Sequence, residues 1–174
     1  IGSIDGEALF DMAGAMNGED YMTMGNDSAF GMFETMGNDT VGEMAGDTMA
    51  GMFDAMGADN IDSIGGEALF DMAGAMSGDD YSTMGSDSAF GMFETMGDDR
   101  VMDMDKDAMG GMFGAMDHEQ IAGMEGDTSF GAFETMGTDG FMDLGGDTMA
   151  GMFDSMGADH IQDIGGEQIF DMVG

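Results

Sequence analysis

Large apolar side chains recur along this chain with a 20-residue period, and their spacings within each period suit a helix. In residues 41–60 they stand at positions 1, 4, 9, 12, 13 and 16 of the unit, with Val41 at position 1. Steps of three and four residues are typical of a helix with one buried face, whereas the strict alternation of a half-buried strand is absent. The pattern therefore predicts helices rather than strands.

The register holds without insertion or deletion through eight complete units and a partial ninth at residues 161–174. Position 16 is Met in all eight complete units, and positions 7 and 19 are acidic in every unit that contains them. A fixed period of this length predicts an array in which each unit buries its apolar face against its neighbours. We treat residues 1–174 as one repeat array, and because it begins with Ile1 and stops in mid-unit, we expect a fragment of a longer one.

The longer of two helices expected in each unit is illustrated by residues 48–56. Asp47 is expected to act as its N-cap, because a carboxylate there accepts hydrogen bonds from free backbone N–H groups and suits the helix dipole. Gly57 is expected to end it with a left-handed conformation.

A shorter helix follows, with Asp59 as its expected cap, Ile61 and Ile64 as its apolar pair, and Gly65-Gly66 as its end. Neither helix is long enough to be stable alone, so packing along the array must hold both. The predicted fold is all-α, an α-solenoid of about 20-residue units that each contain a short and a longer helix. A β-solenoid is the alternative, although the low content of Val, Ile and Thr argues against it.

A longer period is superimposed on the unit. Residues 1–20 and 61–80 agree at 16 of 20 positions, and residues 21–40 and 81–100 also agree at 16 of 20. This superperiod of three units indicates either one superhelical turn for every three units or a duplication of three units together.

The 27 Met residues belong mainly to the apolar positions of the unit. We expect Met at position 16 and Phe at positions 10 and 13 to be buried, with Met as a flexible filler between short helices. Thioethers also select Cu(I), so a copper store is an alternative. The two histidines, His118 and His160, fall in turns, where we expect ordinary surface residues.

Charge restricts the partners more than any motif does. The chain has 37 acidic residues and two basic ones, Arg100 and Lys106, which gives a formal net charge of −35. Such a chain repels nucleic acid and anionic membrane surfaces. No apolar run approaches the length of a membrane-spanning helix, so we expect no membrane insertion. Self-repulsion destabilises the compact state unless cations screen it, which favours a salt-rich or divalent-rich extracellular setting.

Repeated carboxylates in Gly-rich turns are the candidate metal ligands. Calcium takes six to eight oxygens from carboxylates, Asn side chains and carbonyls, and there is no Cys to form a thiolate site. If units stack directly on one another, positions 7 and 19 each form a ladder of carboxylates. The candidate calcium ligands are Asp27, Asp39, Asp47, Asp59, Asp87, Asp99, Asp103, Asp105, Asp107, Asp127, Asp139, Asp147 and Asp159.

No catalytic constellation is visible, and no Gly-rich segment is followed by the Lys and Ser or Thr of a phosphate loop. The sequence therefore predicts no enzyme. The leading interpretation is a structural or interaction protein, a cation-stabilised part of an extracellular array or filament that associates end to end. The alternatives are a metal-binding protein, which uses its carboxylates for calcium or another hard cation or, less readily, its Met residues for Cu(I), and an acidic scaffold that nucleates mineral.

Overall fold

The computed structural model describes residues 5–173, which form helices and contain no strand. The predicted all-α class is confirmed, and the β-solenoid alternative is wrong for these residues. Most units contain a longer and a shorter helix that are separate from each other. The longer helices are α1 (Gly6–Ala13), α3 (Asn26–Met36), α5 (Gly46–Met56), α7 (Gly66–Ala73), α9 (Ser86–Met96), α11 (Lys106–Ala115) and α15 (Gly166–Val173). The shorter ones are α2 (Gly18–Tyr21), α4 (Asn38–Val41), α6 (Ala58–Ile61), α8 (Gly78–Tyr81), α10 (Asp98–Met102) and α12 (His118–Ala122).

Two elements, α13 (Gly126–Met142) and α14 (Gly146–Asp163), each combine a longer and a shorter helix across a kink. The kinks lie at Gly137, with φ 69° and ψ 173°, and at Gly157, with φ 67° and ψ 176°. A residue with a side chain rarely adopts this backbone conformation, so glycine permits the chain to turn between two helices without a loop.

The longer helices begin earlier than the sequence predicts. Ala45 is the N-cap of α5, and its carbonyl accepts hydrogen bonds from the backbone N–H groups of Thr48 and Met49. Asp47 therefore lies inside the first helical turn of α5, and the prediction that Asp47 is the N-cap is wrong. Its charge still lies near the positive end of the helix dipole, which is favourable without a capping hydrogen bond.

The shorter helices differ in the same way. Gly57 is the N-cap of α6, so Asp59 lies in the first turn, and the helix ends at Ile61 rather than at Gly65-Gly66. Gly57 has the expected positive φ of 73°, but its ψ of 162° is extended and not left-handed helical. Gly57 is thus both the C-cap of α5 and the N-cap of α6, so α6 starts directly after it and before Asp59.

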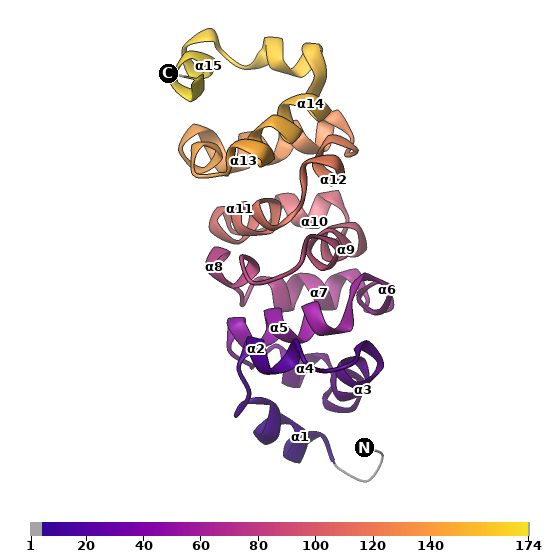
Figure 1. Ribbon diagram of the computed structural model, residues 1–174. Helices are drawn as coiled ribbons and strands as arrows, with labels where there is room; N and C mark the ends of the chain where they lie inside the picture. The colour runs from indigo at the N-terminus through magenta and orange to yellow at the C-terminus, as the bar shows by residue number, and fades with distance from the viewer. Residues whose placement is uncertain (1–4, 174) are drawn as a thin grey trace.

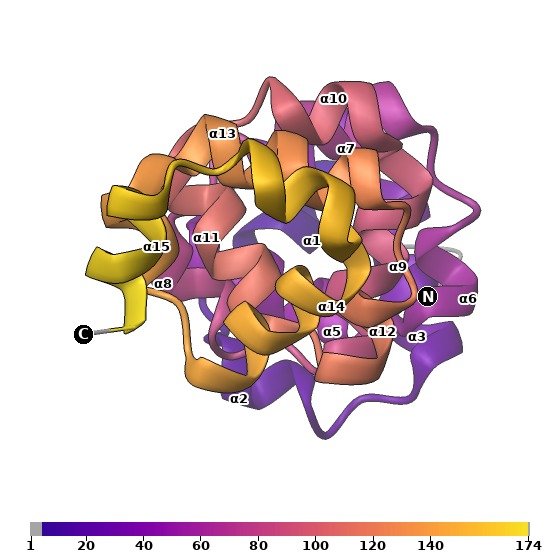
Figure 2. The ribbon, with the colours of Figure 1, turned by 90° about the horizontal axis from the view of Figure 1, so that it is seen from above.

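Helices pack against others that lie about one and a half units away in the sequence. The side-chain hydrogen bonds that join such helices span 26 to 33 residues, for example 30 between Thr128 and Asp98. Short and longer helices are paired in this way in α2 with α5, α6 with α9, α8 with α11, and α12 with α14. The chain therefore returns to the same side of the molecule after about one and a half units, and we call each such passage a turn. Figure 1 shows the turns piled from α1 to α15, and Figure 2 shows the same pile from above.

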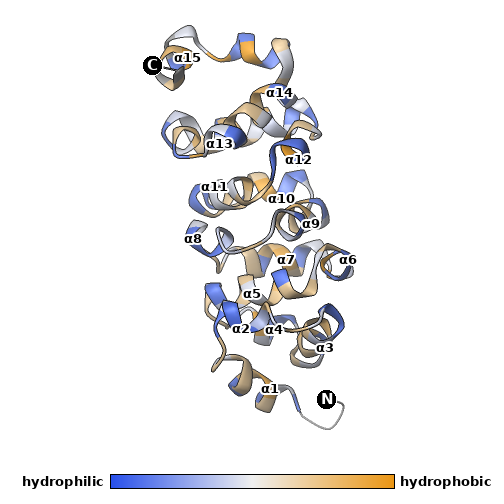
Figure 3. Cartoon of the chain, in the orientation of Figure 1, coloured by the Kyte–Doolittle hydropathy of each residue, from blue (hydrophilic) through white to orange (hydrophobic). Residues whose placement is uncertain are grey.

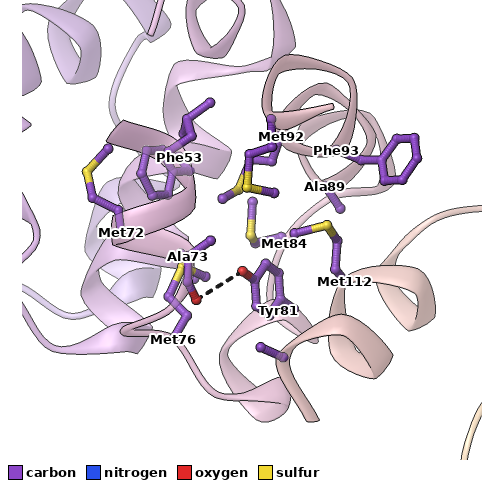
Figure 4. Packing of buried hydrophobic residues seen from close by; sticks show 14 of the residues in the cluster. Phe53, Met72, Ala73, Met76, Tyr81, Met84, Ala89, Met92, Phe93 and Met112 are labelled. Carbon is purple, nitrogen blue, oxygen red and sulfur yellow. Dashed lines mark hydrogen bonds between the residues drawn. The ribbon is translucent and has the colours of Figure 1, made fainter. Parts of the chain in front are cut away.

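The interior is filled by positions 1, 4, 9, 12, 13 and 16 of the unit, and Figure 4 shows one section of it around Tyr81 and Met84. The prediction for position 16 is confirmed, since Met36, Met56, Met76, Met96, Met116, Met136 and Met156 are buried, while Met16 is half-buried. The position-13 Phe residues are buried too, except Phe153, which is half-buried.

The Phe residues at position 10 are not fully buried, and that prediction is wrong. Phe30, Phe90 and Phe130 are half-buried because each ring stacks over the outer side of the position-13 ring on the same helix. The ring centroids of Phe30 and Phe33 are 6.3 Å apart at an interplanar angle of 10°. Position 10 therefore forms the edge of the core rather than its centre.

Candidate cation-binding carboxylates

All thirteen candidate ligands are described and exposed. Those at position 7 are the second residues of the longer helices, and those at position 19 lie in the first turn of the shorter ones. In unit six, Asp103 is the C-cap of α10 and Asp105 is the N-cap of α11, where its carboxylate accepts from the backbone N–H of Asp107 at 2.9 Å. The sequence repeat and the helix starts thus place these carboxylates at the same points of successive units.

Positions 7 and 19 meet in grooves between successive turns. Asp59 of α6 and Asp87 of α9 line one groove of about 600 Å3, and Asp39 of α4 lines another of about 530 Å3 with Glu67 of α7. Each row of carboxylates alternates the two positions, rather than repeating one position as the sequence predicts. The reason is the length of the turn, one and a half units, which puts a short helix of one unit beside a longer helix of a later one.

A third groove, of about 620 Å3, lies over α11 between α8 and the second half of α13. Asp79, Asp107 and Asp139 line it in that order of turns, so position 19, position 7 and position 19 follow one another. Gly110 and Gly114 of α11 also line it, as does the basic residue Lys106, whereas most other units have larger side chains at positions 10 and 14.

Several carboxylates hold one turn against the next. Asp107 accepts a hydrogen bond from the backbone N–H of Gly78 at 3.0 Å, and Asp87 accepts one from the side-chain amide of Gln120 at 3.1 Å. Hydrogen bonds to a charged acceptor are stronger than neutral ones, so these contacts fix the spacing of the turns.

Two more inter-turn carboxylates were not predicted from the sequence. Asp54 accepts from the backbone N–H of Gly85 at 2.7 Å, and Asp98 accepts from the hydroxyl of Thr128 at 2.6 Å. Their partners lie 31 and 30 residues away in the sequence. These separations are not multiples of the 20-residue unit, so the repeat alone does not predict the two contacts.

The two histidines also join turns. The Nε2 atom of His160 lies 2.9 Å from Asp127 Oδ1, and its ring stacks on Phe130 with centroids 5.0 Å apart. His160 is therefore half-buried and not the ordinary surface residue that we expected. His118 is exposed, and its Nδ1 atom lies 3.3 Å from the backbone carbonyl of Asp147.

The other candidate carboxylates have no hydrogen-bond partner in the protein within residues 5–173, and they are those of Asp27, Asp39, Asp59, Asp99, Asp103, Asp139, Asp147 and Asp159. The described part of the chain brings no three acidic or histidine side chains close enough together to hold a metal ion. Calcium binding by the thirteen residues stays a prediction. The grooves are lined by carboxylates from adjacent turns, such as Asp59 and Asp87, and calcium takes oxygen ligands of this kind.

Comparison of the chain with protein-family models, with curated proteins and with solved structures finds no match. Hydrophilic and hydrophobic residues are mixed on the same helices along the whole molecule (Figure 3), and no described helix is long and apolar enough to cross a membrane.

Proposed function

We propose that this chain is a structural repeat protein, an acidic α-solenoid stabilised by cations and belonging to an extracellular array or filament. The observation that carries the proposal is the agreement between the sequence repeat and the packing. Every unit supplies helices to the same kind of inter-turn contact, and the interior is continuous from Leu9 to Ile164. A molecule built in this way grows by adding units, without enlarging a central core.

The role proposed for cations rests on the charge. With a net charge of −35, carboxylates on adjacent turns repel one another, and Asp59 faces Asp87 across a groove that contains Glu94 but no Lys or Arg. A cation that binds between the turns of the folded array adds stability by mass action. The extracellular setting follows from this need for screening or for divalent ions.

The superperiod suggests a direct experiment on the proposed architecture. Removal of residues 41–100 takes out three whole units and joins residue 40 to residue 101. Because residues 21–40 match residues 81–100 at 16 of 20 positions, the junction resembles the natural one. Gly18 then meets Gly111, which in the intact chain meets the equivalent Gly78.

A solenoid should survive this deletion with unchanged helix content per residue and a length reduced by about a third, measured by circular dichroism and small-angle X-ray scattering. Removal of residues 41–90 is the matched control, because it joins position 20 of one unit to position 11 of another and destroys a helix. We expect that variant to lose cooperative unfolding. If the deletion of three whole units unfolds the chain as well, the proposed architecture is wrong.

A further inference from the structure

Helix α10 is attached to α13 of the next turn at two points, one near each end of the short helix. At the start of α10, the carboxylate of Asp98 accepts a hydrogen bond from the hydroxyl of Thr128 at 2.6 Å. At the end of α10, Met102 lies against Gly131, since a Cβ atom on that glycine would lie 3.4 Å from the Sδ atom of Met102 and 3.9 Å from its Cγ and Cε atoms. The second attachment therefore depends on a thioether.

The equivalent contact three units earlier, between α4 and α7, has the opposite arrangement. There the short helix has Gly42 at position 2 and the longer helix has Met72 at position 12, and a Cβ atom on Gly42 would lie 3.7 Å from Met72 Cγ. In the α10–α13 contact, position 2 is Met102 and position 12 is Ala132. Position 12 is Met in every other unit. Each contact thus contains one methionine, but the two methionines come from opposite partners.

This exchange changes the exposure of the sulfur. Met72 on the longer helix is 1% exposed, whereas Met102 on the short helix is half-buried. A thioether at the edge of the molecule is accessible to a small oxidant, while one in the interior becomes accessible only when the structure opens locally. Met22 and Met142 also occupy position 2 of their units and are exposed. Met102 differs from both because its sulfur lies against the backbone of another turn.

We propose that Met102 is a site of reversible oxidation to methionine sulfoxide that loosens the contact between α10 and α13. The oxidant is a peroxide, such as hydrogen peroxide from the surroundings. A lone pair of the sulfur attacks one peroxide oxygen, so that an S–O bond forms as the O–O bond breaks, and the second oxygen leaves as water after proton transfer. The sulfur is oxidised by two electrons and the peroxide is reduced. Methionine sulfoxide reductases reverse the step with two thiols, which become a disulfide while the oxygen leaves as water.

The sulfoxide loosens the contact because its oxygen is a hydrogen-bond acceptor without a donor on α13. Gly131 and Ala132 have no polar side chain, and backbone N–H groups in the middle of this helix already donate to carbonyls one helical turn earlier. A polar atom held in such a contact loses its water without a replacement, which costs stability. The oxidised side chain therefore turns toward solvent, and α10 keeps only the attachment through Asp98. This response requires neither a cation nor a second molecule, so it is separate from the proposed function.

Trypsin isolates the site, because Arg100 and Lys106 are the two Lys or Arg residues of the chain. Cleavage after both releases residues 101–106, which contain Met102 and Met104. Met104 is 6% exposed, so it is a buried reference within the same peptide. After brief treatment of the folded protein with hydrogen peroxide, fragmentation mass spectrometry of this peptide should find the sulfoxide mainly on Met102. Equal oxidation of the two residues would overturn the proposal.

Thermal unfolding of the treated protein measures the consequence. The Tm of the wild type should fall by about 2 °C or more, and the two reductases with dithiothreitol should restore it. Met102→Leu keeps an apolar side chain of similar volume but has no sulfur, so we expect its Tm to fall less by that amount under the same treatment. The double variant Met22→Leu with Met142→Leu is the matched control. It removes the two exposed position-2 sulfurs and should lose as much Tm as the wild type.

Exchange of the two contact residues tests the geometry itself. Met102→Gly combined with Ala132→Met rebuilds the arrangement of α4 and α7, so the methionine should resist peroxide as Met72 does and the Tm should respond as in Met102→Leu. Met102→Leu decides the question if the exchanged variant does not fold. Equal losses of Tm in the treated wild type and the treated Met102→Leu protein would show that oxidation of Met102 does not loosen the contact, and the proposal would fail.

Discussion

Glycine at position 11 of the unit should have opposite effects on stability in two neighbouring helices. In α5, a Cβ atom on Gly51 would lie 2.4 Å from the Cα atom and 2.6 Å from the carbonyl oxygen of Gly18. In α3, a Cβ atom on Gly31 would meet nothing within 4 Å. Both glycines lie inside 11-residue helices, so the two substitutions by Ala differ mainly in what the added methyl group contacts.

The magnitude follows from those distances. Carbon atoms pack at about 3.5–4.0 Å, so Gly51→Ala requires the backbone of α2 to move by more than about 1 Å. Overpacking typically costs about 1–3 kcal/mol, and a rigid backbone neighbour places this case at the upper end. Replacing Gly by Ala inside a helix returns about 0.5–1 kcal/mol. We expect Gly51→Ala to destabilise by about 2 kcal/mol and Gly31→Ala to stabilise by about 0.5–1 kcal/mol.

Thermal unfolding followed by circular dichroism measures both variants. For a chain of this size, 1 kcal/mol corresponds to about 2–4 °C, so the Tm should fall by about 4–8 °C for Gly51→Ala and rise by about 1–4 °C for Gly31→Ala. Gly111→Ala repeats the first result, because its Cβ atom would lie 2.4 Å from the Cα atom of Gly78. If Gly51→Ala and Gly31→Ala both raise the Tm, then α2 and α5 do not approach as closely as described, and the reasoning fails.

Further predictions concern tyrosine, methionine and cations. The hydroxyl of Tyr21 is buried without a partner, whereas that of Tyr81 donates to the carbonyl of Ala73 at 3.3 Å. In urea titrations, Tyr81→Phe should therefore cost about 1 kcal/mol and Tyr21→Phe should be neutral or stabilising, and equal losses would contradict this. Burial raises the pKa of Tyr21 from 10.0 to about 12. The unfolded chain loses the proton first as pH rises, so stability should fall as the pH rises from about 10 to about 12. Alkaline melts of Tyr21→Phe should lack that part of the fall. Met56→Ala should cost about 2–5 kcal/mol in the same urea titrations, because Met56 is fully buried, and an unchanged midpoint would contradict that. Millimolar calcium should raise the Tm more than sodium at equal ionic strength, and a Tm insensitive to both ions would remove the case for cation stabilisation.

The class of fold and the composition of its core could be predicted from the sequence, because both depend on features that repeat in every unit. Apolar steps of three and four residues identify helices, and Met at position 16 is buried in seven of the eight complete units. The exact helix starts could not be predicted. The N-caps of α3, α5, α7 and α9 are Gly or Ala, whose side chains cannot accept a capping hydrogen bond. From the sequence we therefore predicted the acidic residue two positions later as the N-cap.

The candidate cation sites depend on which unit packs on which, and a repeat alone does not contain that information. The period of the sequence is compatible with direct stacking of units, in which Asp47 would lie beside Asp27. The structure places a short helix over a longer one after about one and a half units, so Asp107 meets Gly78 and not another position-7 carboxylate. The sequence predicted ladders of position-7 or position-19 carboxylates alone, whereas in the structure carboxylates of the two positions alternate from turn to turn.

The three-unit superperiod acquires a physical meaning from this geometry. Three units of the described chain make about two turns. Only after three units does a longer helix return to the same side of the molecule with a partner of the same kind. The glycine contacts follow this rule: Gly18 meets Gly51 as Gly78 meets Gly111, and a Cβ atom on Gly6 or Gly66 would lie 2.9 or 2.5 Å from the carbonyl oxygen of Thr35 or Thr95 respectively. An array that lengthens by whole superperiods keeps these close contacts, whereas one that adds single units must form them anew with different partners.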